Sequence, residues 1–463
     1  MSADDEKLVE LDDAEKDVGN NNKKKCLIII IVLVIILILG LAAFLIYFFI
    51  LREKDEKLCE PGYYLVNDNC KPYSFVATYR NDYQDENIQL INENYVSYIE
   101  GMYMDNLVMD IKSNYTFSSI GNHVIYFYMN IPSFDLVRDL FNNIIKMVSI
   151  DFTTEFNSKN INSMESFFYN CYSLTSINFS NFNSSNVENM EKMFYNCSSL
   201  TSLDLSNFDT SRVKVMTNMF YNCISLVSLD LSNFDTSNVV FMYGLFGSCY
   251  SLTSIKLSSF NTSKVMGMTS MFSACHSLTS IDLSNFDTSS VEVMINMFGY
   301  CTSLTSLDLS NFNTSLVSDM TNMFGGCESL TYIDVSNFDT SRVTRMGVMF
   351  MGCRSLSSID LSSFNTPSLT NMDSMFLGCS SLTSIDLSSF NEGQLKSISA
   401  LFTNSIKLSY IDLSSFPESL FSSPSVFFNI SNTGTIMINK DIEIANIQEI
   451  FESLNMSWTV KQK

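Results

Sequence analysis

Histidine is almost absent from this chain, which carries two among its 463 residues. His276 stands at a repeat position that other units fill with serine, isoleucine or glutamate, so it is interpreted as an exposed spacer. The sequence also lacks a phosphate-binding glycine loop, an H-E-x-x-H motif, a nucleophile elbow and any Cys/His metal spacing. These absences argue against an enzyme, and no cofactor is expected.

Positive charge is also scarce. Lysine and arginine total 27 against 49 aspartates and glutamates, which gives a formal net charge of -22 at pH 7. Nucleic acids attract clustered lysine and arginine, and the only such cluster flanks the apolar segment described below. The composition therefore predicts that nucleic acid is not a partner.

The main positive feature is a strict internal repeat, because nine cysteines follow one another at intervals of 26 residues. They are Cys171, Cys197, Cys223, Cys249, Cys275, Cys301, Cys327, Cys353 and Cys379. A fixed period of this length indicates one small unit stacked many times, so the fold is expected to follow from the repeat.

The first half of each unit has the pattern of a short strand. In the unit over 197–222, Leu200, Leu203 and Leu205 form an L-x-x-L-x-L series whose last part alternates with Ser202 and Asp204. Alternation with a period of two is typical of a strand with one buried face. A strand is therefore predicted at this place in every unit.

The second half of each unit is predicted to be a helix. The residues at 209–211 are Asp-Thr-Ser, whose side-chain oxygens can accept hydrogen bonds from the free amides that open a helix. Apolar residues follow at spacings of three and four, which would place them on one helical face: Val213, Met216, Met219, Phe220 and Cys223. The predicted fold class is an α/β repeat solenoid of strand-turn-helix units.

Phenylalanine and methionine recur with the same period, from Phe182 to Phe416 and from Met164 to Met372. Such a stripe could line a cofactor cleft, but identical residues in every unit favour stacked core ladders. One unit has too little apolar surface to offset its chain entropy, so isolated repeats are not expected to fold.

The string MFxxCxSLTSLDLSNFDTSxVxxM resembles the BspA-like leucine-rich repeat surface proteins, also described as surface proteins with 26-residue repeats, over about residues 144–416. The resemblance implies a right-handed leucine-rich-repeat-like coil, and it implies adhesion and the binding of host or matrix proteins. The chain departs from the familiar leucine-rich pattern at Phe208, where an asparagine ladder would stand, with Asn207 one place earlier.

The nine ladder cysteines are interpreted as buried thiols that act as small hydrophobic side chains. Equivalent cysteines point in parallel directions, and packed helices lie about 8–10 Å apart, whereas a disulfide needs β-carbons within about 4.5 Å. An odd number also leaves at least one unpaired. Metal or redox chemistry is the alternative. Ser405 continues the cysteine register as the repeats decay.

Residues 27–51 contain no charged side chain. At about 1.5 Å per residue, the segment could cross a hydrocarbon core of about 30 Å, and a cleavable signal peptide would be shorter. A transmembrane helix is therefore predicted over 26–51. Four lysines before it against three basic residues after it favour a cytosolic amino terminus, preceded by a disordered tail over 1–25.

Two further features point to an oxidising compartment for the rest of the chain. The C-x-P-G-Y-Y sequence at Cys59, with Cys70 after it, resembles small extracellular cysteine modules, and a Cys59–Cys70 disulfide is predicted in a stalk over 52–70. Glycosylation is predicted at Asn114, Asn178, Asn183, Asn261, Asn313, Asn429 and Asn455.

The repeats, over 140–416, need closed ends, because an open solenoid exposes core and strand edges. The Tyr-, Val- and Ile-rich sequence over 71–139 predicts a β-rich amino-terminal cap. Residues 417–463 suggest strand, helix and strand, and therefore a small α+β carboxy-terminal cap. Either cap could instead hold a binding site.

The outward position between the last two leucines is acidic in most units, which predicts an exposed acidic ladder. Its members are Asp204, Asp230, Asp282, Asp308, Asp334, Asp360, Asp386 and Asp412, with Asn178 and Lys256 as the exceptions. Three interpretations stay open: a solvated face, a site for a basic protein or peptide, and divalent-cation binding. An open row lacks the closed set of ligands that calcium usually takes.

The sequence as a whole predicts a single-pass plasma-membrane protein whose extracellular repeats recognise a protein or cell-surface ligand, or act in adhesion, without catalysis. Catalytic carboxylate pairs need unlike environments, whereas repetition makes these environments alike. Further contact candidates are Tyr172, Tyr250, Arg212, Arg342, Arg345 and Arg354. The alternative is an intracellular, membrane-tethered scaffold with cytosolic repeats.

Overall fold

The structure is a computed structural model that describes residues 35, 63–66, 69–105, 107–130, 137–391, 394–421 and 424–463. The chain divides into two compact units, residues 1–71 and 72–463. In the first unit, strands β1 (Tyr63–Val66) and β2 (Asn69–Pro72) form a two-stranded sheet.

The second unit begins with antiparallel strands that lead into the repeats. The elements of this part are β3 (Phe75–Asn81), β4 (Asn87–Gln89), η1 (Glu93–Tyr98), β5 (Ile99–Met104), β6 (Leu107–Val108), β7 (Asn114–Thr116), β8 (Gly121–Met129) and β9 (Met147–Phe152). Strand β9 pairs antiparallel with β3 and parallel with β10 (Ser176–Asn178). The sheet order β10-β9-β3-β8-β5-β6 therefore joins the amino-terminal strands to the first coil.

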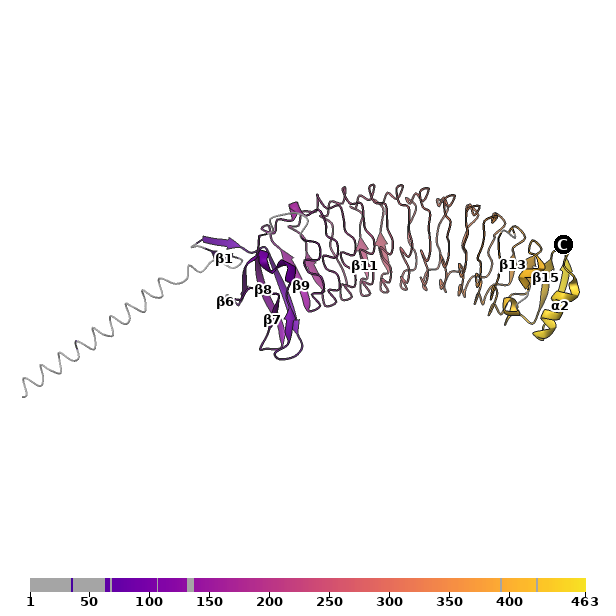
Figure 1. Cartoon of the computed structure of the whole chain (residues 1–463), viewed down its shortest axis with the longest axis horizontal. Helices are drawn as coiled ribbons and strands as arrows, with labels where there is room; N and C mark the ends of the chain where they lie inside the picture. Colours follow the sequence, from indigo (N-terminus) through magenta and orange to yellow (C-terminus); the bar gives the residue numbers. More distant parts are fainter. Residues whose placement is uncertain are drawn as a thin grey trace, which may run out of the picture. The chain divides into compact units, whose positions relative to one another are not determined.

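From β9 onward the chain winds into coils of one repeat each, stacked side by side (Figure 1). The strands of the coils are parallel, as in β11 (Ser228–Asp230) and β12 (Ser254–Lys256), or β13 (Ser384–Asp386) and β14 (Tyr410–Leu413). A second line of parallel bridges joins the coils elsewhere, from Ser163–Asn189 to Arg345–Asn371. The fold is a β-solenoid.

The predicted strand-turn-helix unit is wrong in its second half, and its predicted strand forms in only some units, since the units over 197–222 and 275–378 contain none. The described residues of the coils contain no α-helix, and the segment predicted as helical consists of consecutive turns. Asn218 and Asn222 have φ angles of 55° and 61°, and equivalent residues with positive φ recur along the coils. Residues in the left-handed region do not fit within a right-handed α-helix, so the fold class is corrected to a β-solenoid.

Hydrogen bonds explain why this segment imitates a helix in the sequence. The N–H groups of Asn218, Phe220 and Asn222 donate to carbonyl oxygens of the next coil at 2.7, 3.0 and 2.8 Å. The intervening N–H groups of Met219 and Tyr221 donate to carbonyls three residues earlier in the same coil. These turns bring apolar side chains inward at spacings of three and four, the same period that indicates a helix.

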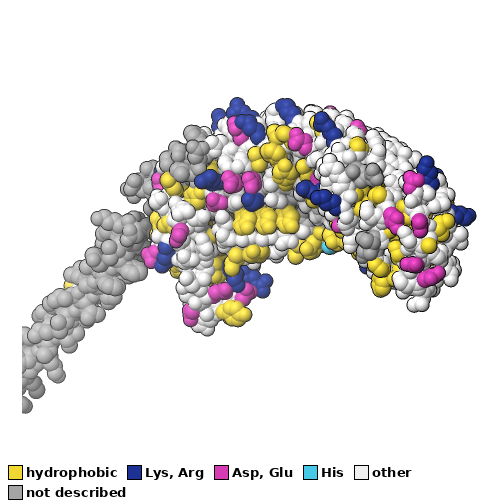
Figure 2. Space-filling model, turned by 45° about the vertical axis from the view of Figure 1, so that its right-hand side comes forward, with side chains coloured by type: hydrophobic (Ala, Val, Ile, Leu, Met, Phe, Trp, Pro, Cys, Tyr) yellow, Lys and Arg dark blue, Asp and Glu magenta, His cyan; other side chains and the backbone are white. Residues whose placement is uncertain are grey.

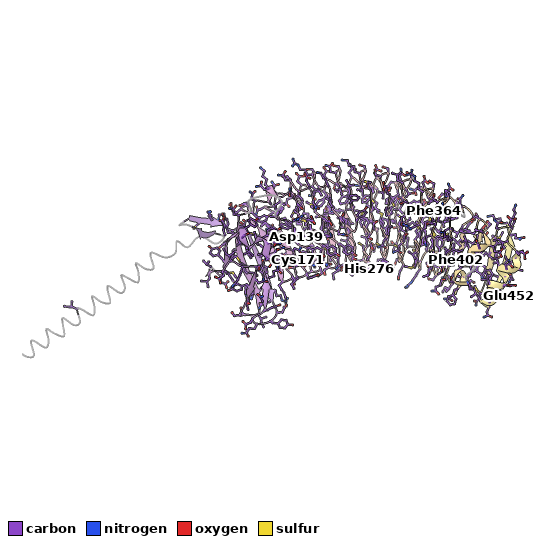
Figure 3. The ribbon with its side chains drawn as sticks, viewed as in Figure 1. Asp139, Cys171, His276, Phe364, Phe402 and Glu452 are labelled. Carbon is purple, nitrogen blue, oxygen red and sulfur yellow. The ribbon has the colours of Figure 1, made fainter. Side chains whose placement is uncertain are left out.

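The interior of the solenoid is formed by the predicted ladders. The nine ladder cysteines are free and buried, as predicted. Ring centroids of Phe298, Phe324 and Phe350 follow one another at 5.9 and 5.5 Å in nearly parallel planes. Figure 3 places Cys171 in the first coils and Phe402 in the last ones, so one apolar core runs through the stack.

The solenoid ends in a parallel sheet of four strands, β13-β14-β15-β16. Its last elements are β15 (Thr433–Ile438), α2 (Ile444–Ser453) and β16 (Ser457–Gln462), and the short turns η2 (Ser158–Asn160), η3 (Glu418–Phe421) and η4 (Pro424–Phe427) complete the structure. Phe451 of α2 stacks on Trp458 of β16 with centroids 5.2 Å apart. Helix α2 thus covers the end of the apolar core.

The predicted membrane attachment is corrected. Among the residues that the structure describes, no helix is both long and apolar enough to cross a membrane. This finding corrects the predicted transmembrane helix and, with it, the single-pass plasma-membrane location. Apart from Ile35, the predicted segment over 26–51 and the tail over 1–25 lie outside the described residues.

Candidate functional site

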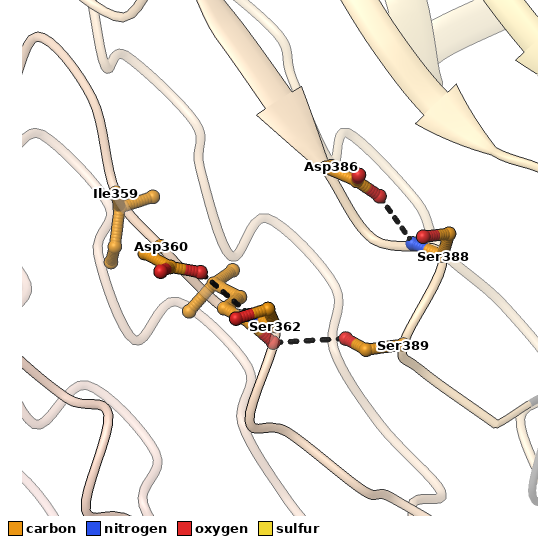
Figure 4. A pocket seen from close by; sticks show the side chains of 7 residues that line it. Ile359, Asp360, Ser362, Asp386, Ser388 and Ser389 are labelled. Atoms are coloured by element: carbon orange, nitrogen blue, oxygen red, sulfur yellow. Dashed lines mark hydrogen bonds between the residues drawn. The ribbon is translucent and has the colours of Figure 1, made fainter.

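The predicted acidic ladder lies on the strand side of the coils, where its carboxylates also form turns. In each of its eight aspartates, Oδ1 accepts the backbone N–H of the serine two residues later, at 2.8 to 3.0 Å. Figure 4 shows this bond for Asp360 and Asp386 beside a small surface hollow. Hydrogen bonds from Ser206 hold the pKa of Asp204 below its ordinary value, so the ladder is charged at neutral pH.

Two lysines neutralise positions near the ends of this ladder. Lys256 Nζ lies 2.7 Å from Asp230 Oδ2, and this pairing is the main reason that the pKa of Asp230 falls to about 2. Lys463 Nζ lies 2.7 Å from Asp412, which is buried. Between them lie five exposed carboxylates that form no ion pair in the described part of the chain: Asp282, Asp308, Asp334, Asp360 and Asp386. We call these five residues the acidic row.

Neighbouring carboxylates of the acidic row repel one another. The neighbouring carboxylates of Asp308 and Asp360 raise the pKa of Asp334, although the hydrogen bonds from Ser336 outweigh them and the net shift is downward. Tyr332 stands two residues before Asp334 in the same stretch of chain and is 61% exposed. Among the described residues, no group of three or more His, Cys, Asp or Glu side chains could hold a metal ion.

The other predicted contact residues are spread over different edges of the coils. Tyr172 and Tyr250 are exposed and share one repeat position with Arg354. Arg345 pairs with Asp319 at 3.1 Å, and Arg212 donates to Asn186 at 2.9 Å. Arg342 is exposed on the edge that carries Arg212. The structure therefore does not gather these arginines into one site.

A concave site lies on the edge that carries Arg354. It has a volume of about 440 Å³ and crosses several coils. Its lining is Tyr300, Gly326, Glu328, Met351, Gly352, Arg354, Leu377, Gly378, Ser380 and Asn404. We call it the glycine trough, because Gly326, Gly352 and Gly378 occupy equivalent positions of three successive coils.

Comparison with known families accounts for the repeats. The model of a family described as "Mycoplasma protein of unknown function, DUF285" matches residues 136–255, 225–333 and 319–440. The matches overlap and together cover well over half of the chain. The chain belongs to this family. No curated protein matches it. Membership of DUF285 establishes a repeat family and agrees with the predicted resemblance to BspA-like repeat proteins, but the family description assigns no function.

Sequence reasoning missed a buried threonine column in this DUF285 chain. Thr288 Oγ1 donates to Asn313 O at 2.9 Å and accepts the Asn313 N–H at 2.8 Å, so one hydroxyl bridges two coils twice. Thr210, which was predicted to open a helix, likewise donates to Asp235 O of the next coil at 2.9 Å. The available signal was the recurrence of threonine between two polar neighbours in most units.

A second missed feature is a column of stacked tyrosines. Tyr169, Tyr195 and Tyr221 stack with centroids 4.9 and 5.2 Å apart and stand at the same position of three units. The three rings are half-buried. On the face of the molecule that Figure 2 shows, hydrophobic side chains lie at the surface beside charged ones. The recurrence of tyrosine with the cysteine period would have revealed the column.

The predicted covalent modifications stay predictions in this DUF285 protein. Cys70 is disulfide-bonded, whereas Cys59, its predicted partner, lies outside the described residues. The side chains at all seven predicted glycosylation positions are exposed. Exposure permits modification there but does not establish it.

Proposed function

We propose that this protein is a non-catalytic recognition module whose acidic row binds a basic face of a protein partner. The observation that carries the proposal is the row itself, five exposed carboxylates without ion pairs between two positions that lysines neutralise. The resemblance to BspA-like proteins supports protein recognition as the role, and adhesion would be one case of it.

The spacing of the acidic row favours a helical partner. Parallel strands lie about 4.8 Å apart, and an α-helix rises about 5.4 Å per turn. A helix with one lysine or arginine per turn on a single face would therefore bring one positive charge close to each aspartate. Tyr332 adds an exposed aromatic side chain within the row, of a type that often anchors protein interfaces.

The uniformity of the row supports binding rather than catalysis. A catalytic pair of carboxylates needs two environments that separate their pKa values. Here Asp282, Asp308 and Asp360 share one hydrogen-bonding arrangement, and their pKa values are all lowered by the serine two residues later. All would be charged together at neutral pH, which suits attraction of a basic surface.

The test uses the full-length chain and a helical peptide that carries one lysine per turn on one face. A peptide of the same composition with scrambled order is the first control. We expect the patterned peptide to bind more tightly, and the affinity to fall as salt rises because exposed charges are screened. Equal binding of the two peptides would contradict recognition by spacing.

Two matched variants locate the binding surface. The first changes D282N, D308N, D334N and D360N in the acidic row. The control changes D209N, D235N, D287N and D339N, which remove the same number of charges from a second exposed column of turn-forming residues. Asparagine should keep both kinds of turn, since Asn178 and Asn261 accept the same bond from Ser180 and Ser263. Only the first variant should lose affinity, by about tenfold or more; equal loss in both would refute the proposal.

A further inference from the structure

The glycine trough arises from missing side chains in one column. The residue before each ladder cysteine has a positive φ, and in the early coils it is asparagine, as at Asn196 and Asn222. The amide of Asn222 donates to Asn196 Oδ1 at 2.6 Å, so these side chains fill the edge with a ladder. Glycine replaces asparagine in three later coils, where φ is 75°, 68° and 73°.

The backbone alone does not require glycine along the whole trough. A Cβ built on Gly352 would meet nothing closer than the Cα of Gly326 at 3.8 Å. Asparagine adopts the same conformation elsewhere in this column and tolerates the left-handed region. Gly352 and Gly378 therefore leave open a space that the fold could have filled.

The head of the trough is an aromatic residue in a strained conformation. Tyr300 has a φ of 63°, which is uncommon for a bulky residue, and its side chain is 43% exposed. A Cβ on Gly326 would lie only 2.7 Å from the Tyr300 ring, so the ring rests against this glycine. His276 Nδ1 lies 2.9 Å from the Tyr300 carbonyl oxygen and ties the residue to the preceding coil. Strained residues of this kind concentrate at binding sites.

The two rims of the trough differ in chemistry. The residue before each glycine forms one rim, which is apolar at Met351 and Leu377. The other rim carries Glu328, Arg354 and Ser380. Arg354 and Glu328 pair across two coils at 3.3 Å, so this rim offers donors and acceptors with little net charge.

We propose that the glycine trough binds a linear, uncharged oligosaccharide. Sugar rings have apolar C–H faces, which suit the glycine floor, the Tyr300 ring and the Met351 and Leu377 rim. Their hydroxyl groups both donate and accept hydrogen bonds, as the polar rim does. The lining also repeats with each coil, as the units of a linear oligosaccharide do.

The floor of the trough disfavours an extended peptide. The N–H groups of Gly326, Gly352 and Gly378 already donate to carbonyl oxygens of the next coil, each at 2.6 or 2.7 Å. A peptide that adds to a protein edge depends on free main-chain donors and acceptors, and these donors are not free. An occupant must therefore bind by shape and by the rim side chains.

The experiment measures binding of cellohexaose, maltohexaose and chitohexaose to the full-length chain by titration calorimetry. Gly352→Asn fills the trough with the residue that the column carries elsewhere, so the variant should fold and melt like the parent. Ser248→Asn places the same side chain at the same column position outside the trough, where φ is 59°. We expect one probe to bind, Gly352→Asn to weaken it about tenfold or more, and Ser248→Asn to leave it unchanged.

Three results would overturn the proposal. The first is that none of the three sugars binds the parent chain, and the second is that Gly352→Asn binds a sugar as well as the parent does. The third is that Gly352→Asn weakens the binding of the lysine-patterned peptide used in the preceding test, which would assign the trough to protein binding. The peptide-binding test changes no residue of the glycine trough, so either proposal can fail while the other stands.

Discussion

Two columns of ionisable side chains run along this solenoid with the same spacing and opposite properties. The thiols of the cysteine ladder are buried, and each donates to a phenylalanine carbonyl oxygen, as Cys301 does to Phe272 O at 3.1 Å. Burial raises the pKa of Cys249, Cys301 and Cys379 to about 12. The exposed Asp204 and Asp360 have lowered pKa values because hydrogen bonds favour their charged form. The 26-residue repeat therefore sets the spacing of both columns, whereas burial or exposure on the coil determines whether their side chains are neutral or charged.

The largest expected effect is alkaline unfolding driven by the thiol ladder. A thiol in the unfolded chain has a pKa of about 8.5, so its stabilising contribution is complete below that pH and is lost as the pH rises toward about 12. Each thiol should cost about 1.4 kcal/mol of unfolding free energy per pH unit. Nine thiols in one cooperative unit would cost on the order of 10 kcal/mol per pH unit. Urea unfolding from pH 7 to 10 measures the slope.

Two variants at Cys301 separate the titration of the thiol from its packing. Ser405 replaces cysteine in the last coil and donates to Phe376 O at 2.8 Å, so a hydroxyl fits this position. Cys301→Ser and Cys301→Ala should both reduce the alkaline slope by one thiol. Cys301→Ala should also lose the side-chain hydrogen bond to Phe272 O at every pH, while that oxygen keeps the Cys275 N–H. An unchanged slope in both variants would mean that burial does not control the titration.

The next effect compares a buried with an exposed threonine. Thr288→Val removes the hydroxyl that bonds both the N–H and the carbonyl of Asn313, which should cost about 1–3 kcal/mol for each orphaned group. Thr305→Val is the control, because its exposed hydroxyl donates to Thr279 O, which also accepts the Thr305 N–H. The control should stay within about 0.5 kcal/mol in chemical unfolding. Equal losses would show that the buried column has no special role.

The position five residues before a ladder cysteine is asparagine at Asn218, Asn296 and Asn322, and a stabilising change is expected where Val348 takes this position. Val348 has a φ of 52°, a strained value for a β-branched residue. Asn322 donates to Asn296 at 2.7 Å, but its own Oδ1 is buried and has no hydrogen-bond partner. Val348→Asn should relieve the strain and supply a donor, which would raise the unfolding free energy by about 1–3 kcal/mol.

Val348→Gly is the matched control for that gain. Glycine relieves the same strain but brings no amide, so the difference between the variants isolates the hydrogen bond to Asn322. If Val348→Gly stabilises as much as Val348→Asn, or if both destabilise, the orphaned oxygen is not the cause. Thermal melting of the two variants beside the parent chain decides between these outcomes.

The sequence could predict those parts of the fold whose residue spacing belongs to one kind of secondary structure only. The strand was predictable in the units that form one, because Leu229 and Leu231 alternate with Ser228 and Asp230 and only a strand has that period. The turns around Asn218 and Asn222 were not, because they return apolar side chains at helical spacing. The asparagines themselves were the overlooked signal, since asparagine enters the left-handed region readily. For the site, the acidic row was visible as a repeat, whereas the glycine trough depends on side chains that are absent from one edge.

The smallest effect tests the exposed column itself. Asp204→Asn should keep the turn, because Asn178 accepts the same bond from Ser180 at 3.0 Å, whereas Asp204→Ala removes the acceptor. The pKa of Asp204 is lowered by Ser206, so its stabilising contribution is present above the unfolded value of about 3.9 and is lost as the pH falls. Asp204→Asn should therefore melt slightly below the parent at pH 7, and this gap should narrow as the pH falls through the acidic range. A gap that does not narrow would mean that the bond to Ser206 does not depend on the charge, and the two columns would then differ in burial alone.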